Sequence, residues 1–224
     1  MFEDFALVGK ELFESGLVCS HSGNLSIRKG ESIFITRRDV MLAHLKEDDI
    51  IELPLEGKGE RDEEASRELV VHRAIYKNTG ALAIVHAHPA HAIALSIVES
   101  KIIPQDAEGS FFLRSVPVVR VREAIGSDEV AKLLPPIFSS NYVVAVVKGH
   151  GSFSVGSSVL EAYHYTSCLE NTCRIITILK PLEARPPRVA EPRKAIPPGI
   201  GVMDRRRRRE FGERGRGRRR YPPR

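Results

Sequence analysis

The chain has 224 residues, of which 42% are hydrophobic and 28% charged, so it is long enough to bury one good hydrophobic core. No apolar run approaches the ~18–20 residues of a membrane-spanning helix, and charged residues near the start argue against a signal peptide. The three cysteines, Cys19, Cys168 and Cys173, have no disulfide-framework spacing. They predict reduced thiols in a cytoplasmic protein, with Cys168 and Cys173 buried.

The net charge of +5 is distributed unevenly along the chain. Residues 181–224 contain 15 Lys and Arg against 5 Asp and Glu, whereas residues 1–180 contain 19 against 24. The same last segment holds 8 of the 14 prolines. We therefore predict a folded domain over 1–180 and a disordered basic tail over 181–224, because the tail cannot bury enough apolar area to offset its ordering entropy. Its arginines suit solubilisation or weak contact with nucleic-acid phosphates.

Hydrophobic periodicity and turn residues divide the body into alternating helices and strands. In the first half, the predicted elements are a helix over 2–15 that Gly16 ends, strands over 25–28, 32–36 and 50–53, and a helix over 64–78. In the second half, they are a buried strand over 81–87, a helix over 89–98, a strand over 116–121 near a sheet edge, a helix over 128–138 disturbed by its prolines, a buried strand over 142–147 and a long helix over 159–179. This alternation predicts a layered α/β domain.

The most informative motif is His86-Ala87-His88 at the end of the strand over 81–87. Residues i and i+2 of a strand point to the same face, so the two imidazoles lie side by side. Two polar rings on a buried strand need a common partner, and imidazole is a preferred ligand of zinc. The pair therefore predicts a metal site.

His150 is the candidate third ligand, because Gly149-His150-Gly151 directly follows the strand over 142–147. Glycines on both sides allow close backbone approach. Three histidines with an open fourth position are the arrangement of a catalytic zinc site, whereas structural zinc sites are closed by four protein ligands. Taken alone, the motif is also typical of a glycine-rich turn with an exposed histidine.

Several other residues are candidates for the site, although the sequence around each of them is less specific than the histidine motifs. Glu68 is either a solvated carboxylate at a helix start or a group that acts beside the metal. His72, four residues later, is expected to have a structural role. Small or basic residues that suit an anion stand at Gly23, Asn24, Thr36, Arg38, Ser66 and Arg67.

Taken together and in order, these motifs resemble the class II aldolase/adducin family, with fuculose-1-phosphate aldolases as the most similar members. The resemblance covers about residues 5–180 and rests on Gly23-Asn24-x-Ser26, Ile35-Thr36, Ser66-x-Glu68 with His72, His86-x-His88-Pro89 and Gly149-His150-Gly151 with Glu161-Ala162. It implies a three-layer α/β/α fold around a mostly antiparallel sheet, and a homotetramer with active sites between subunits.

The resemblance also implies the chemistry of the site. One zinc ion would be bound by His86, His88 and His150, and Glu68 would bind the metal or act as acid and base. Gly23, Asn24, Thr36 and Ser66 would help to hold a substrate phosphate, with Arg38 and Arg67 as additional candidates. The implied reaction cleaves a phosphorylated ketose, such as fuculose-1-phosphate, to dihydroxyacetone phosphate and a short aldehyde.

Three departures from the family pattern keep other reactions open. Arg38-Asp39 stands where a small Thr/Ser-Gly pair is usual, and Arg67 stands where a serine is expected. The stretch 104–115 lacks the tyrosine that would act as the aldehyde-side acid, for which Asp106 or Glu108 is a candidate substitute. The alternatives are a metal-dependent epimerase, dehydratase or decarboxylase of the same fold, or a non-catalytic adducin-like scaffold.

Overall fold

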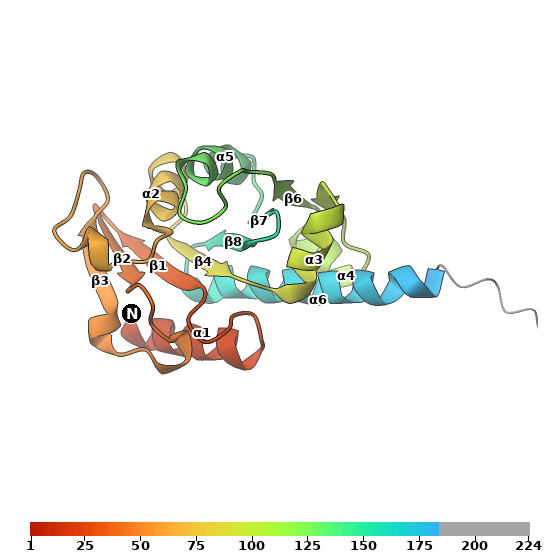
Figure 1. The fold of residues 1–224 in the computed structure, drawn as a ribbon, viewed down its shortest axis with the longest axis horizontal. Coiled ribbons are helices and arrows are strands. Elements are labelled where there is room, and N and C mark those ends of the chain that lie inside the picture. The colour runs from red at the N-terminus through yellow and green to blue at the C-terminus, as the bar shows by residue number, and fades with distance from the viewer. Residues whose placement is uncertain (184–224) are drawn as a thin grey trace, which may run out of the picture. The chain divides into compact units, whose positions relative to one another are not determined.

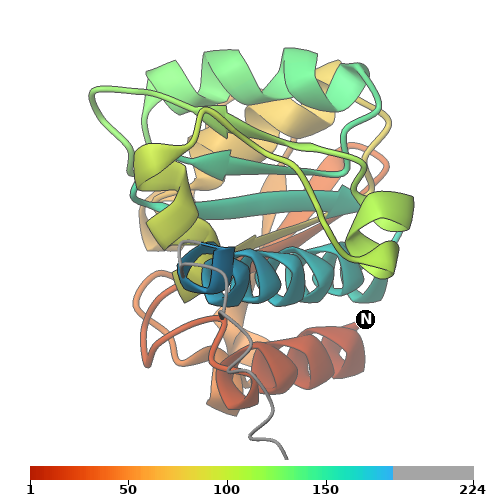
Figure 2. The same cartoon turned by 90° about the vertical axis from the view of Figure 1, so that its right-hand side faces the viewer.

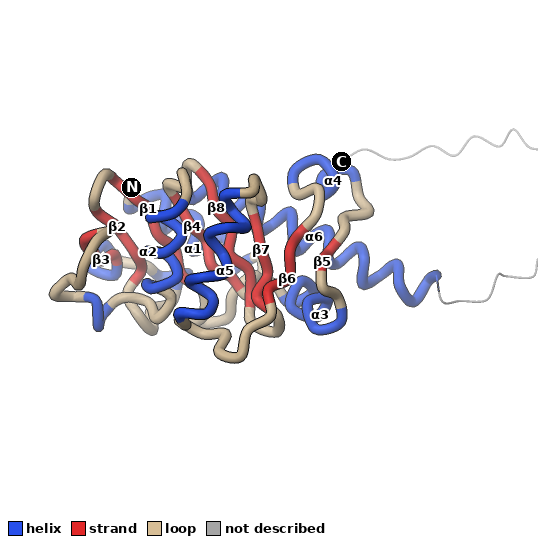
Figure 3. The backbone as a smooth tube through the Cα atoms, turned by 90° about the horizontal axis from the view of Figure 1, so that it is seen from above, coloured by secondary structure: helices blue, strands red, loops and turns tan. Residues whose placement is uncertain are grey.

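The computed structural model describes residues 1–183, which form an eight-stranded sheet with helices on both faces (Figure 1). The strand order is β3-β2-β1-β4-β8-β7-β6-β5, and Figure 3 shows the strands side by side in this order. The strands are β1 (Asn24–Lys29), β2 (Ser32–Thr36), β3 (Ile50–Pro54), β4 (Ala83–Ala87), β5 (Lys101–Ile102), β6 (Val116–Val119), β7 (Val144–Val147) and β8 (Gly151–Gly156). All neighbouring strands pair antiparallel except β6 and β7, so the mostly antiparallel sheet is confirmed.

The helices form the two outer layers, which Figure 2 shows above and below the sheet. They are α1 (Phe2–Glu14), α2 (Leu69–Asn78), α3 (Ala90–Val98), α4 (Ala107–Phe112), α5 (Asp128–Ser139) and α6 (Val159–Glu183). Side chains of α2 and α5 pack with one face of the sheet, and those of α1, α3 and α6 pack with the other. The predicted α/β/α layering is therefore confirmed.

Strand β4 lies in the middle of the sheet and contributes to the cores on both faces. Ile84 packs in the cluster beneath α2 and α5, while Ala83 and Val85 pack in the cluster beneath α1 and α6. Successive strand residues point to opposite faces, so a strand covered on both sides needs a continuous apolar sequence. This explains why the residues of β4 before His86 are all apolar, rather than alternating between apolar and polar.

The helix predicted over 64–78 begins later than expected, and this moves Glu68. Residues 62–64 form a separate 3-10 turn, and α2 begins only at Leu69. Between them, Ala65 forms a bridge with Arg37, and the Ser66 N–H donates to the Thr36 carbonyl at 3.2 Å. Pairing with the end of β2 thus replaces the first helical turn. Glu68 becomes the residue immediately before α2, rather than a member of that turn.

Strand β8 was missed, since only a glycine-rich turn was predicted in this region. Its sequence, GSFSVG, has small and polar residues that do not resemble a central strand. The neighbours β4 and β7 supply its hydrogen bonds, so the tertiary structure decides its conformation. The short elements β5 and α4 were also missed, and α5 continues through Pro135 and Pro136 to Ser139.

Other predictions concern the cysteines, the tail and the membrane. Cys168 and Cys173 are buried as expected, whereas Cys19 is exposed. A basic tail was predicted over 181–224, and its residues from 184 onward lie outside the part of the chain that the structure describes. Within residues 1–183, no helix is long and apolar enough to span a bilayer.

Candidate metal centre and active site

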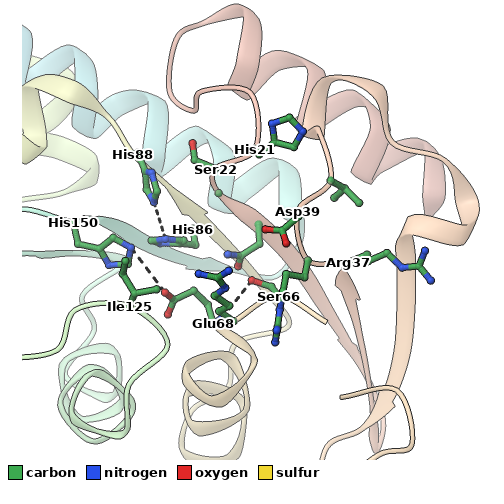
Figure 4. A pocket seen from close by; sticks show the side chains of 15 residues that line it. His21, Ser22, Arg37, Asp39, Ser66, Glu68, His86, His88, Ile125 and His150 are labelled. Atoms are coloured by element: carbon green, nitrogen blue, oxygen red, sulfur yellow. Dashed lines mark hydrogen bonds and ion pairs between the residues drawn. The ribbon is translucent and has the colours of Figure 1, made fainter. Parts of the chain in front are cut away.

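Three histidines converge where β4 ends beside the turn between β7 and β8 (Figure 4). His86 lies in β4, His88 directly follows this strand, and His150 lies in the turn. The turn reaches the end of β4 because β8 pairs with β4 on one side and with β7 on the other. Gly151 permits this approach, since a Cβ there would overlap the Ala87 carbonyl and lie 2.7 Å from His88 Cδ2.

The spacing of the imidazoles fits a shared metal ion. The Nε2 atoms of His86 and His88 lie 3.1 Å apart, and the candidate ligand atoms of all three histidines lie within 4.8 Å of one another. Two nitrogens on one tetrahedral zinc ion stand about 3.3 Å apart, which matches the first pair. His86 Nδ1 donates to the Ser152 carbonyl at 3.0 Å, and this tautomer leaves the lone pair on Nε2. The three residues can therefore bind a metal.

Burial keeps the imidazoles in the form that a metal requires. It lowers the pKa of His86 well below its ordinary value, and the neighbouring His88 and His150 lower it further. Burial, assisted by His150, lowers the pKa of His88 to about 4, and burial also lowers the pKa of His150. All three rings are therefore neutral near pH 7, which is the ligand state of histidine.

Glu68 lies beside the histidines but outside their cluster. Its Oε1 accepts a hydrogen bond from the Gly126 N–H at 2.9 Å and lies 3.9 Å from His150 Nε2. Its Oε2 is buried and has no hydrogen-bond partner among the described residues. Burial raises the pKa of Glu68 to about 7, against the opposing effect of the Gly126 N–H. A carboxyl group with this pKa can both accept and donate a proton near neutral pH.

His72 does not line the cavity in front of the three histidines. It is completely buried, and its Nδ1 lies 2.6 Å from the Ser26 hydroxyl, which in turn lies 2.7 Å from the Tyr76 hydroxyl. Its ring packs edge-on against Phe153, and Phe153 stacks on His86. These contacts agree with the structural role expected for His72.

Acid is expected to destabilise the metal-free protein through His72. Burial lowers the pKa of His72 to about 3, whereas an unfolded histidine titrates near 6.5. Between these values the unfolded state binds more protons, so the free energy of unfolding falls as the pH drops, by up to about 1.4 kcal/mol per pH unit for one such group. Urea unfolding of the metal-free protein at pH 7 and pH 5 measures this loss. His72→Gln should reduce the difference, and an unchanged difference would contradict the assignment.

A cavity of about 180 Å³ opens in front of the histidines and Glu68. Five predicted substrate-binding residues line it: Gly23, Asn24, Arg38, Ser66 and Arg67. Asn24 stands opposite His86 in the register of β1 and β4, so sheet pairing brings the loop before β1 to the three histidines. Thr36 does not line the cavity, because it is completely buried and its hydroxyl accepts a hydrogen bond from the Leu25 N–H at 3.2 Å.

Further residues line the cavity that the sequence did not assign to the site: His21, Ser22, Arg37, Asp39, Val40 and Ile125. Asp39 has a φ of 58°, a conformation that glycine adopts more easily, and it belongs to the Arg38-Asp39 pair that departs from the expected family pattern. This departure was visible in the sequence, whereas Ile125 lies in an irregular loop without a recognisable motif. Arg37 forms an ion pair with Glu64, so its charge is partly neutralised.

Asp106 is one of the two candidates for the aldehyde-side acid, and both of its carboxylate oxygens accept hydrogen bonds within the fold. Its Oδ2 accepts the Gly109 N–H at 2.8 Å and caps α4, while its Oδ1 accepts the Thr172 hydroxyl at 2.7 Å. Glu108, the other candidate, is exposed on α4. Neither residue lines the cavity in front of the histidines.

The fold and this site define a class of protein, and comparisons with known proteins agree with it. The model of the Class II Aldolase and Adducin N-terminal domain family matches residues 3–177. The chain therefore belongs to the class II aldolase/adducin family.

Three relatives show what the chain is similar to within this family. An L-fuculose phosphate aldolase of Methanocaldococcus jannaschii is 30% identical over 77% of this chain and 93% of its own length. The crystal structure of L-fuculose-1-phosphate aldolase from Thermus thermophilus superposes with a TM-score of 0.79 at 36% identity, over 83% of this chain and 97% of that one. A 3-oxo-tetronate 4-phosphate decarboxylase of Haemophilus influenzae is 29% identical over 77% of this chain and 85% of its own.

Proposed function

We propose that this chain is a zinc-dependent aldolase that cleaves a phosphorylated ketose, such as fuculose-1-phosphate, to dihydroxyacetone phosphate and a short aldehyde. The observation that supports this most directly is the buried carboxyl group of Glu68 beside three neutral histidines whose ligand atoms lie within 4.8 Å of one another. A non-catalytic scaffold has no need for such an arrangement. The similarity to fuculose phosphate aldolases supports the choice of substrate.

In this proposal, each residue has a defined task. His86, His88 and His150 hold the metal, which when bound acts as a Lewis acid on the substrate oxygens next to the bond that breaks. Glu68 moves a proton to and from the substrate carbon, since its pKa of about 7 makes both directions accessible near neutral pH. The surrounding protein atoms exclude most water from Glu68, whose exposed fraction is only 3%.

The part of the cavity wall that is formed by the loop before β1 and by residues 38, 66 and 67 binds the substrate phosphate in this proposal. Gly23 offers its backbone, Asn24 and Ser66 offer short side chains, and Arg38 and Arg67 offer guanidinium groups. Thr36 contributes through its hydrogen bond to Leu25 N, which ties the start of β1 to β2 next to this wall.

A decarboxylase reaction is the second candidate, and Arg67 favours it specifically. Arg67 lines the cavity, where relatives are expected to carry a serine, and it has no carboxylate partner within the described residues. Guanidinium groups bind carboxylates as well as phosphates. The named substrate of the Haemophilus influenzae relative contains both groups.

Metal analysis and a two-substrate assay on the same preparation test both candidates. Freshly purified protein is expected to contain about one zinc per chain and to release dihydroxyacetone phosphate from fuculose-1-phosphate. Release of carbon dioxide from 3-oxo-tetronate 4-phosphate, without aldol cleavage, would favour the decarboxylase. Absence of metal from fresh protein would contradict the catalytic proposal and favour the scaffold.

We further propose that the protein is a cytoplasmic homo-oligomer, with a tetramer as the family-based expectation. Exposed apolar residues on α3, α4 and the segments beside β5 support an interface at this end of the domain: Ile97, Val98, Ile103, Phe111 and Phe112. Figure 3 shows α3, α4 and β5 together at one end of the sheet.

A further inference from the structure

The turn that carries His150 is fixed by three backbone N–H groups. The His150 N–H donates to the Val147 carbonyl at 3.0 Å and closes the turn. Gly149 is the third residue of this turn, and its φ of +71° is a conformation that glycine adopts without strain. The Lys148 N–H donates to a carbonyl of β6 at 2.9 Å, and the Gly149 N–H donates to the Ser96 hydroxyl at 2.9 Å. Of these three bonds, only the last one involves a side chain.

Ser96 lies on α3, the helix that begins two residues after His88. Ser96 is completely buried, and its hydroxyl donates to the Ile93 carbonyl at 2.6 Å. Because a hydroxyl group has one proton and two lone pairs, its oxygen can still accept the Gly149 N–H. One short helix thereby connects the end of β4, which carries His88, with the turn that carries His150.

Helix α3 is itself held at its start and along its buried face. Glu170 of α6 accepts the N–H groups of His91 and Ala92 at 3.1 and 3.2 Å, and its Oε1 lies 2.7 Å from His91 Nδ1. Leu95 packs in the same core cluster as Val146 of β7, the strand that leads into the turn. The helix is therefore fixed to the sheet and to α6, and it gives the turn a stable point of attachment.

Three histidines bind one metal ion tightly only if their rings keep the right spacing. The ring centroids of His88 and His150 lie 5.2 Å apart, although the two residues belong to different segments of the chain. We propose that Ser96 is a positioning residue for His150, because its hydroxyl fixes the turn of His150 to the helix that follows His88. Ser96 acts through the backbone of Gly149 and not through an imidazole. This inference rests on the proposed function, in which both histidines bind zinc.

Ser96→Ala tests the inference, with Ser154→Ala as its matched control. Ser154 is also completely buried, and its hydroxyl accepts a hydrogen bond from the Thr166 hydroxyl at 2.8 Å. It stands opposite Val85 and Val144 in the sheet, away from the turn. Each variant removes one buried hydroxyl group, so both should lose a similar amount of stability.

Zinc affinity is the first readout, measured by competition with a chromogenic chelator at a temperature at which all three proteins are folded. We expect the affinity to fall about 10- to 100-fold in Ser96→Ala, which is the usual effect of removing a group that orients a metal ligand. In Ser154→Ala the affinity should stay within about twofold of wild type. A merely structural role of Ser96 would lower stability in both variants without this difference in affinity.

Hydrogen exchange is the second readout, and it needs neither metal nor substrate. Without the Ser96 hydroxyl, the Gly149 amide has lost its partner. Peptides that cover residues 147–151 should therefore exchange faster in metal-free Ser96→Ala than in wild type, and at the wild-type rate in Ser154→Ala. If Ser96→Ala does not fold, Ser96→Cys takes its place, because a thiol fills nearly the same space and is only a weak acceptor.

The outcomes separate this inference from the proposed function. A zinc affinity of folded Ser96→Ala within twofold of wild type, an equal loss in Ser154→Ala, or unchanged exchange over residues 147–151 would overturn the inference while the wild type still binds zinc. A wild-type protein that binds no zinc would contradict the proposed function, and the inference would fail with it.

Discussion

His88→Ala is expected to lose the bound metal together with all measurable cleavage of substrate. His88 Nε2 lies 3.1 Å from His86 Nε2, so its removal deletes one of three nitrogens that share the proposed ion. Loss of groups that only support a metal ligand already lowers affinity about 10- to 100-fold, so loss of a ligand should cost more than 100-fold. Metal content after dialysis and aldol cleavage on the same samples measure both effects.

His44→Ala is the matched control for His88→Ala. His44 is exposed and does not line the cavity, so its replacement should leave metal content and activity at wild-type levels. A His88→Ala protein that retains about one metal ion per chain would show that the ion is bound elsewhere. Equal losses in both variants would point to a general effect of histidine removal.

Glu68→Gln is expected to lower kcat by roughly 10²- to 10⁴-fold while the metal stays bound. Glutamine keeps a carbonyl oxygen that can accept the Gly126 N–H, and its volume is nearly the same, so the fold and the three histidines should be undisturbed. It has no titratable proton, however, and the proton transfer assigned to Glu68 cannot occur. Steady-state kinetics and metal content of the same preparation separate the two properties.

Glu63→Gln controls for the loss of a negative charge nearby. Glu63 lies five residues before Glu68 and forms only an exposed contact with Lys58 at 3.4 Å. Its replacement should change kcat by less than about twofold, because exposed ion pairs contribute little. A Glu68→Gln enzyme with wild-type kcat would remove the acid/base role, and a simultaneous loss of metal would indicate that Glu68 is a ligand.

Features that depend only on neighbouring residues in the chain could be predicted from the sequence. The apolar period of β4 and the i, i+2 spacing of His86 and His88 place two imidazoles on one strand end, whatever the rest of the chain does. The layered α/β class followed from the alternation of helical and strand-like hydrophobic patterns along the chain. The resemblance to the family added the expectation that most strands are antiparallel. The sequence alone also indicated Gly23, Asn24, Arg38, Ser66 and Arg67 as candidates, all of which line the cavity.

Other features depended on contacts between distant segments. Strand β8 has a weak local preference and exists because β4 and β7 supply its hydrogen bonds. The late start of α2 has a similar cause, since pairing with the end of β2 occupies residues 65–66 and leaves Glu68 at the helix entrance. Thr36, predicted to be near the phosphate, is buried where β2 pairs with β1, and its hydroxyl accepts the Leu25 N–H.

The sequence by itself therefore determined which residue types are available for metal binding and proton transfer, and it placed His86 and His88 at the end of one strand. Only the tertiary structure decided that His150 meets the end of β4, and that an amide 58 residues away from Glu68 holds its carboxylate. The physical reason is that hydrophobic period and turn chemistry act over a few residues, whereas burial and the pKa of about 7 for Glu68 arise from what packs around it.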